Sequence, residues 1–164
     1  MISTAYVALA FFQVVTYIPS KSAKYVGGTA ATIPREVVGE LNTADQKTLS
    51  FDWGKGGKTD AEGWHVAYSQ VTGLSYGQHA GRRVAAASAA VGGFITAPAA
   101  IPLLLVKKRR HYLTIEFLDD KGKKQGAIFL VGKNAIGPLL DDLAAKTGKK
   151  VQYEDAEARQ AREK

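Results

Sequence analysis

Residues 112–148 read YLTIEFLDDKGKKQGAIFLVGKNAIGPLLDDLAAKTG, and this stretch decides the fold. From residue 112 to residue 118, side chains alternate between two faces, which is the period of a half-buried strand. Asp-Asp-Lys-Gly at residues 119–122 is typical of a tight turn, and residues 127–131 form a second apolar run. The first half of the stretch therefore predicts a β-hairpin.

The second half changes to the period of a helix. Apolar residues recur there at three- and four-residue spacing: Ile136, Leu139, Leu140, Leu143 and Ala144. We expect Asn134 to cap the start of this helix, and Gly148 suits the left-handed position after its last turn. The pattern predicts one amphipathic helix that packs on the sheet.

Four more strands are predicted upstream, between residues 36 and 76, where apolar and polar residues alternate between turn-prone segments. Residues 54–63 (GKGGKTDAEG) separate two of them as a loop, and His65 is expected to face away from the buried side. Residues 150–153 are a candidate edge strand. We therefore expect a mainly β chain of the α+β class: an antiparallel sheet or barrel of about six to seven strands, closed by a C-terminal amphipathic helix.

The composition is that of a globular protein. Of 164 residues, 46% are hydrophobic and 23% are charged, which excludes whole-chain disorder and fibrous classes. The chain has no cysteine, which excludes disulfide scaffolds, thiolate zinc sites and cysteine nucleophiles.

The net charge of +7 is concentrated in one region. Between Glu62 and Glu116 the chain has no acidic residue, and six basic residues there account for nearly all of the excess: Arg82, Arg83, Lys107, Lys108, Arg109 and Arg110. They bracket residues 84–106 (VAAASAAVGGFITAPAAIPLLLV), which contain no ionisable group. The pattern to explain is a long apolar run with a basic flank on each side.

We interpret residues 84–106 as an apolar hairpin inserted between two strands. Two adjacent glycines near its middle and two prolines in its second half interrupt a single helix. Basic residues at both ends also differ from the one-sided charge of a simple membrane span. If residues 71–77 and 111–118 are consecutive antiparallel strands, the insertion must begin and end on the same side of any membrane.

The predicted membrane-binding residues are the basic flanks and the apolar residues of the second arm: Arg82, Arg83, Phe94, Ile95, Ile101, Leu103, Leu104, Lys107, Lys108, Arg109 and Arg110. His111 is expected to extend the basic flank and to strengthen contact with anionic lipid below about pH 6.5. The alternatives are that the hairpin packs on its own domain, docks on a protein partner or a second copy, or spans the membrane.

Residues 5–18 (AYVALAFFQVVTYI) form an uncharged N-terminal run that is followed by lysines. A signal peptide, a retained membrane anchor and an ordinary buried helix all remain open for it. We divide the chain into a signal-like or anchor segment at 1–23, a domain at 24–153 and a charged tail at 154–164. A signal peptide would make the domain periplasmic or extracytoplasmic, whereas an anchor would favour the cytoplasmic face of the membrane.

Motifs for catalysis or cofactor binding are weak. Residues 54–59 (GKGGKT) resemble part of a phosphate-binding loop, but Asp52 stands where that motif needs its first glycine. The three histidines are scattered, no Gly-x-Ser-x-Gly segment occurs, and Asp119-Asp120 suits a turn. The basic residues flank an Ala/Leu run without interleaved aromatics, which disfavours nucleic acid. We expect no enzyme, no cofactor, no metal site and no nucleic-acid partner.

The order of elements resembles the bacterial PH-like domains, a family related to the pleckstrin-homology barrel. The segments that carry the resemblance are Tyr25-Val26-Gly27-Gly28, residues 39–43, 49–51, 66–74, 112–117 and 126–129, and the helix at 139–143. The resemblance covers about residues 25–153, and it implies a binding or scaffolding module that is attached to membranes in some relatives. The chain departs from phosphoinositide binders because residues 36–53 carry no clear basic motif.

The sequence thus predicts a noncatalytic, membrane-associated PH-like module. It would bind an anionic membrane surface through the hairpin at 84–106 and its basic flanks. The alternative is a protein-interaction or homo-oligomerisation module that uses the same hairpin.

Overall fold

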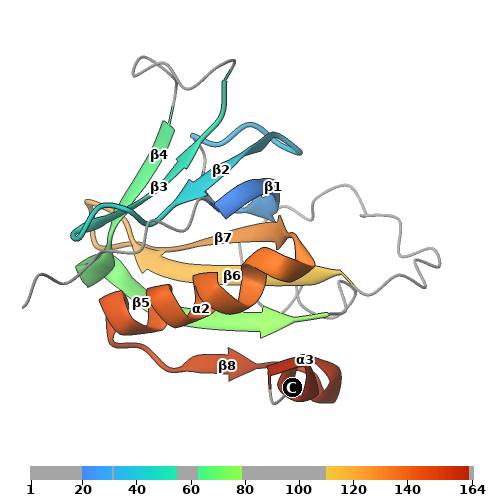
Figure 1. Cartoon of the computed structure of the whole chain (residues 1–164). Helices are drawn as coiled ribbons and strands as arrows, with labels where there is room; N and C mark the ends of the chain where they lie inside the picture. The colour runs from blue at the N-terminus through green and yellow to red at the C-terminus, as the bar shows by residue number, and fades with distance from the viewer. Residues whose placement is uncertain (1–19, 31, 55–62, 79–109, 163–164) are drawn as a thin grey trace, which may run out of the picture.

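A computed structural model describes residues 20–30, 32–54, 63–78 and 110–162 of the chain (Figure 1). Within these ranges lie eight strands: β1 Ser20–Gly28, β2 Val38–Asn42, β3 Thr48–Asp52, β4 Gly63–Ala67, β5 Val71–Gly77, β6 His111–Leu118, β7 Lys124–Val131 and β8 Val151–Tyr153. The helices there are α2 Lys133–Thr147 and α3 Ala156–Arg162, and a 3₁₀ turn, η1 Tyr68–Gln70, links β4 to β5.

The strands form one sheet in the order β4-β3-β2-β1-β7-β6-β5-β8. All neighbours are antiparallel except β5 and β8, which are parallel, so the sheet is mixed. The sheet is open, with β4 at one edge and β8 at the other. The expectation of a mainly β fold is confirmed, and β8 is the edge strand expected at residues 150–153. The expected antiparallel sheet of six to seven strands is wrong, because β1 adds a strand and β8 pairs with β5 in parallel.

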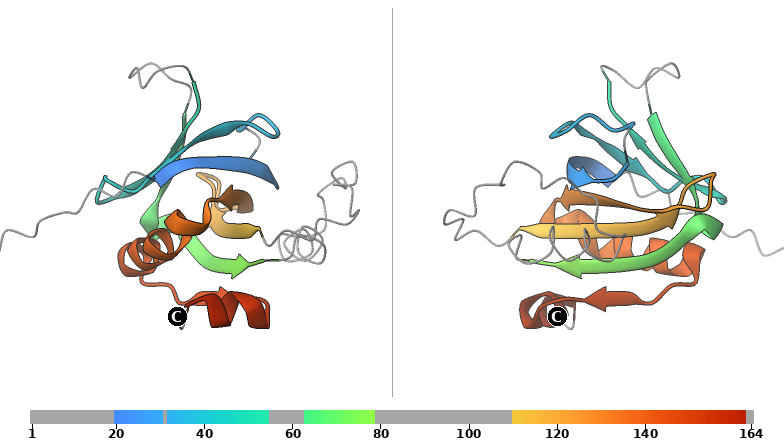
Figure 2. Two further views of the ribbon diagram at one scale, coloured as in Figure 1. Left: turned by 45° about the vertical axis from the view of Figure 1, so that its right-hand side comes forward. Right: turned by 180° about the vertical axis from the view of Figure 1, so that it is seen from behind.

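The sheet bends so that its two halves face each other across one core. Figure 2 shows β2–β4 in one layer and β5–β7 in the other. Phe129 of β7 lies 4.9 Å from Phe51 of β3 between ring centroids, and Trp64 of β4 meets Phe117 of β6 edge-on at 5.3 Å. These rings come from strands that are not neighbours in the sheet, so they hold the layers together by burying large apolar surfaces.

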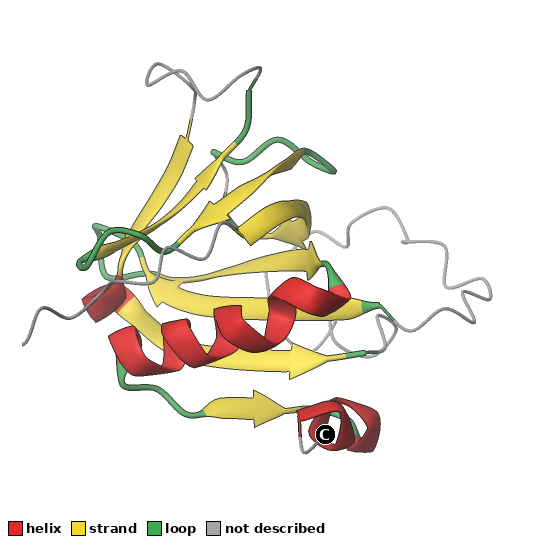
Figure 3. Cartoon of the chain, in the orientation of Figure 1, coloured by secondary structure: helices red, strands yellow, loops and turns green. Residues whose placement is uncertain are grey.

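Helix α2 packs against β1, β6 and η1 (Figure 3). Its buried residues, Ile136, Leu139, Leu140 and Leu143, are those of the predicted apolar face. Gly148 follows it with φ of 66°, the left-handed conformation that was expected there. The expected cap at Asn134 is wrong, because the helix begins earlier and the cap position is held by Gly132.

Strand β1 extends the domain toward the N-terminus. It begins at Ser20, and both Ala23 and Tyr25 are 2% exposed within the core. Residues 20–23, which we grouped with the N-terminal segment, are therefore part of the sheet. Residues 1–19, with the apolar run at 5–18, lie outside the described residues. At the other end, the predicted charged tail contains α3, whose Ala158 is fully buried.

Candidate functional site

The insertion leaves and re-enters the sheet at two paired positions. Gly77, the last residue of β5, lies opposite Tyr112 of β6 in antiparallel register. Gln78 and Arg110 are the described residues that border residues 79–109. The expectation that β5 and β6 are neighbours in one antiparallel sheet is confirmed, so the insertion begins and ends on the same end of this strand pair.

One of the predicted lipid-binding residues belongs to the described part of the chain. Arg110 directly precedes β6 and is exposed. The other predicted residues lie outside the described ranges: Arg82, Arg83, Phe94, Ile95, Ile101, Leu103, Leu104, Lys107, Lys108 and Arg109. Their predicted role therefore stays a prediction.

His111 does not extend the basic flank. It is 8% exposed, and its Nδ1 lies 2.6 Å from the hydroxyl of Tyr76, with the two rings stacked at 5.9 Å. Burial lowers the pKa of His111, and the nearby charge of Lys133 lowers this pKa further. The side chain is therefore buried against Tyr76 and gains a proton less readily than a free imidazole, which contradicts the expected exposed cation of the basic flank.

Gln78 extends this pair into a buried polar chain. Its Nε2 donates to the Tyr76 hydroxyl at 3.2 Å and to the backbone carbonyl of Glu157 in α3 at 3.3 Å. The Tyr76 hydroxyl therefore joins Gln78 to His111, whose Nδ1 accepts from this hydroxyl in one imidazole tautomer and donates to it in the other. These hydrogen bonds fasten the base of the insertion to α3.

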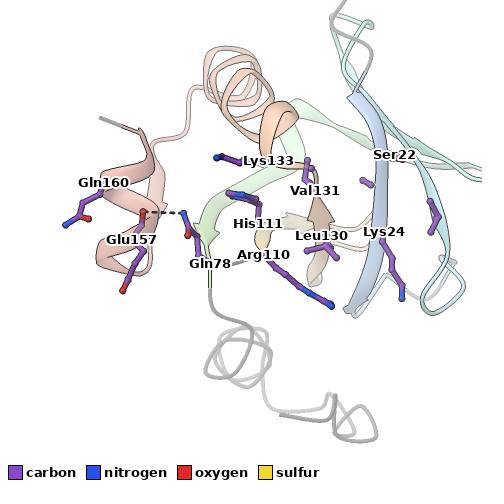
Figure 4. Close-up of a pocket in the computed structure, with 13 residues that line it drawn as sticks. Ser22, Lys24, Gln78, Arg110, His111, Leu130, Val131, Lys133, Glu157 and Gln160 are labelled. Carbon is purple, nitrogen blue, oxygen red and sulfur yellow. Dashed lines mark hydrogen bonds between the residues drawn. The ribbon is translucent and has the colours of Figure 1, made fainter. Parts of the chain in front are cut away.

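A hollow of about 770 Å³ lies beside this polar chain (Figure 4). Its walls come from β1, from the adjoining end of β7 and start of α2, and from α3. Arg110 and His111 line it from the base of the insertion. The hollow and the insertion therefore share one region of the molecule.

The hollow is lined by more positive than negative charge. Lys24, Arg110 and Lys133 contribute cations, and Glu157 contributes one carboxylate. The ammonium of Lys24 lies 3.3 Å from a carboxylate oxygen of Glu36, whose side chain is 75% exposed, so water screens this pair. Arg110 and Lys133 are exposed, and neither forms an ion pair with any residue in the described ranges.

The hollow also has an apolar part, formed by Ala23, Val38, Leu130 and Val131. Val38 is 59% exposed, and within the described ranges it is the one large hydrophobic residue that faces solvent to this extent. A surface that combines an open apolar wall with cations suits a molecule that is itself part apolar and part anionic.

Sequence reasoning missed Lys24 and Lys133 as site residues. Each is an ordinary surface lysine in its local sequence, and the fold brings them to one hollow from β1 and α2. The usable signal was slight: Lys133 opens a helix whose first turn has no acidic residue.

Asp119 and His65 have the surroundings that were predicted for them. Asp119 is a turn residue, as expected, because its carboxylate accepts from the backbone N–H groups of Lys121 at 2.9 Å and Lys123 at 2.8 Å. His65 faces outward on β4, as expected. In the part of the chain that the structure describes, no three His, Asp or Glu residues are grouped as metal ligands, and no helix has the length and apolar character to cross a membrane.

Comparisons with protein-family models, with curated proteins and with solved structures found no match to this chain.

Proposed function

We propose that this protein is a noncatalytic PH-like module that associates with an anionic membrane surface through residues 84–106 and their basic flanks. The observation that carries the proposal is the pairing of Gly77 with Tyr112 at the base of the insertion. Because the two ends of the insertion are held side by side, both basic flanks start from one place on the domain.

The length of the flanks strengthens this reasoning. Arg83 is six residues beyond Gly77, and Lys107 is five residues before Tyr112. At ~3.6 Å per extended residue, each flank stays within ~22 Å of the paired strands. The cations are therefore concentrated near the base of the insertion, and Arg110 and Lys133 add exposed charge there.

The free energies that basic and apolar residues contribute at a membrane surface favour membrane association of the insertion. Each Lys or Arg near an anionic surface contributes about 1 kcal/mol. The uncharged residues between the flanks add an apolar contribution that grows with the area they bury in the interface. One such contribution gives weak, reversible binding, whereas the two together give stable association.

The order of the strands supports the PH-like assignment. A run of four antiparallel strands, β1 to β4, is followed by a run of three, β5 to β7, and β1 joins β7 between them. Helix α2 follows β7 directly and packs against β1 and β6. The resemblance implies a sheet of short strands followed by one C-terminal helix, and the order of β2 to β7 and α2 is consistent with it.

Vesicle co-sedimentation of the full chain tests the proposal. Wild type is expected to pellet with vesicles that contain phosphatidylglycerol, to remain in the supernatant with pure phosphatidylcholine vesicles, and to be released by 0.5 M salt, at which the Debye length is below ~10 Å. A variant in which a short Gly-Ser linker replaces residues 84–106 is expected to lose most of the bound fraction. Replacing Arg82, Arg83, Lys107 and Lys108 by Gln, with the apolar run intact, is expected to lose a smaller part.

Two controls give the result its meaning. A second deletion variant that lacks residues 2–18 keeps every described residue and measures any binding by the N-terminal apolar run. Circular dichroism and thermal unfolding check that each variant keeps the folded sheet. Equal pelleting of wild type and the 84–106 deletion would contradict the proposal, and a lipid-free oligomer that disappears on the same deletion, measured by light scattering, would favour the protein-interaction alternative.

A further inference from the structure

The start of α2 supplies hydrogen-bond donors to the hollow. Gly132 and Lys133 line it, and the first N–H groups of a helix have no acceptor within the helix. The cap residue is a glycine that offers no side-chain acceptor, and the first turn carries no acidic side chain. The positive end of the α2 dipole is therefore not neutralised locally, and it lies with the exposed cations Arg110 and Lys133.

Figure 4 shows how the cations are placed around this helix end. Lys24 and Arg110 extend in the same direction from opposite sides of the hollow, and Lys133 lies at the start of α2. Three cations from different parts of the chain thus line this hollow, against the single carboxylate of Glu157.

Gln78 has a buried side-chain oxygen that needs a hydrogen-bond donor. Its side chain is 5% exposed and lines the same hollow, and its Oε1 is buried without a hydrogen-bond partner among the described residues. A buried acceptor without a donor costs about 1–3 kcal/mol. A ligand that brings a hydroxyl group to this wall would remove that cost, whereas a bare anion has no donor for it.

We infer that this hollow binds the headgroup of an anionic glycerolipid, with the phosphate between Arg110, Lys133 and the start of α2. A hydroxyl of the headgroup donates to Gln78 Oε1, and the first methylene groups of the lipid lie on Val38 and Leu130. The apolar wall distinguishes a lipid from free phosphate as the occupant. The inference rests on the proposed function, since it assigns the lipid contact that the domain itself makes beside the insertion.

Titration with a soluble lipid tests the site apart from membrane insertion. Dihexanoyl-phosphatidylglycerol is added below its micelle concentration to the ¹⁵N-labelled full chain, and amide shifts are followed. Shifts are expected at Lys24, Arg110 and Lys133. We expect the Kd to rise at least fivefold in Lys133→Gln and in Arg110→Gln, and to change less than twofold in Lys149→Gln, which removes the same charge from an exposed position beyond the other end of α2.

Each other outcome counts against the site. Absence of shifts in the hollow, or equal weakening by all three substitutions, would overturn it. Equally tight binding of inorganic phosphate would overturn the assignment to a lipid, and equally tight binding of dihexanoyl-phosphatidylcholine would overturn the need for an anion.

The 84–106 linker variant separates this inference from the proposed function. If that variant no longer pellets with vesicles but still binds the soluble lipid in a Lys133-dependent way, both statements hold. If it pellets like wild type and still binds the soluble lipid in this way, the proposed role of the insertion fails and the headgroup site stands. If wild type pellets through the insertion but the soluble lipid leaves the hollow unaffected, only the headgroup site fails.

Discussion

The two ends of α2 place lysines in opposite surroundings. Lys146, in the last turn, is 13% exposed and has several partners, whereas Lys133, at the first position, is exposed and forms no ion pair within the described ranges. Both side chains have the same chemistry and belong to one helix. The comparison shows that Lys146 stabilises the fold through its local partners, whereas Lys133 makes no such contribution.

The contacts of Lys146 fasten α2 to the turn between β2 and β3. Its ammonium donates to the backbone carbonyl of Thr43, forms an ion pair with Asp142 at 3.2 Å, and lies 5.6 Å from the centre of the Tyr68 ring. A cation in the last turn also interacts favourably with the helix dipole, whereas Lys133 lies at the opposite, unfavourable end. The position of Lys133 therefore costs the helix a little stability, and an anion bound at the hollow would recover it.

Lys146→Met should have the largest effect on stability. The change keeps most of the apolar stem but removes a charged donor, and hydrogen bonds to charged groups contribute about 1.5–3 kcal/mol. We expect a loss of about 2 kcal/mol in the free energy of unfolding, measured by urea denaturation. The matched change at the other end, Lys133→Met, should cost less than about 0.5 kcal/mol, as exposed substitutions do. Similar losses in both variants would remove the distinction between the two ends.

His111 should make stability depend on pH on the side of the hollow. Its pKa is below the ordinary value of about 6.5 in the folded protein, so between these two values the unfolded chain binds more protons than the folded one. The free energy of unfolding should therefore fall as pH drops below about 6.5, by at most about 1.4 kcal/mol per pH unit, and be unaffected by His111 above it.

Urea midpoints between pH 5.5 and 7.5 check this dependence. His111→Asn should flatten the curve in that range, even if the variant is less stable throughout. His65→Gln, at an exposed position on β4, serves as the control and should leave the slope unchanged. An unchanged slope in His111→Asn would show that another group causes the dependence.

The smallest expected effect on stability comes from capping α2 at Gly132. This residue has an extended backbone, with φ of −65°, and a Cβ there would meet nothing within 4 Å, so other residues fit. Gly132→Asp and Gly132→Asn should each raise the free energy of unfolding by about 0.5 kcal/mol, because both side chains cap helices well. In the lipid titration, the aspartate should weaken phosphatidylglycerol binding severalfold, whereas the neutral asparagine should weaken it less. Equal affinities would argue against an anion at the start of α2.

The parts of the fold that follow from local patterns could be predicted from sequence. Trp64 and Val66 alternate with His65, and the apolar face of α2 repeats at helical spacing, so burial of one face leaves a clear period. Strand β1 left no such signal. Its inward residues include Ala23, which is small, and one of its two partner strands, β7, is distant in sequence.

The site was predictable only in part, for a related reason. Arg110 was identified because charges cluster in its own segment, whereas Lys24 and Lys133 reach the hollow through tertiary structure. The burial of His111 could be predicted from sequence, because this residue lies on the same face of β6 as Leu113 and Ile115. The charge of the adjacent arginines suggests an exposed position for His111. The alternation of apolar and polar residues along β6 indicates the buried position correctly.

The pairing at the base of the insertion has a consequence for how this chain can vary. β5 and β6 pair in unbroken register from Gly73 to Gly77, so the residues that hold this strand pair together lie outside the segment that connects them. The entropy of closing a loop rises only slowly with its length, by about 0.6 kcal/mol for each doubling. Changes in the length of the segment between Gly77 and Tyr112 should therefore cost the folded domain little stability.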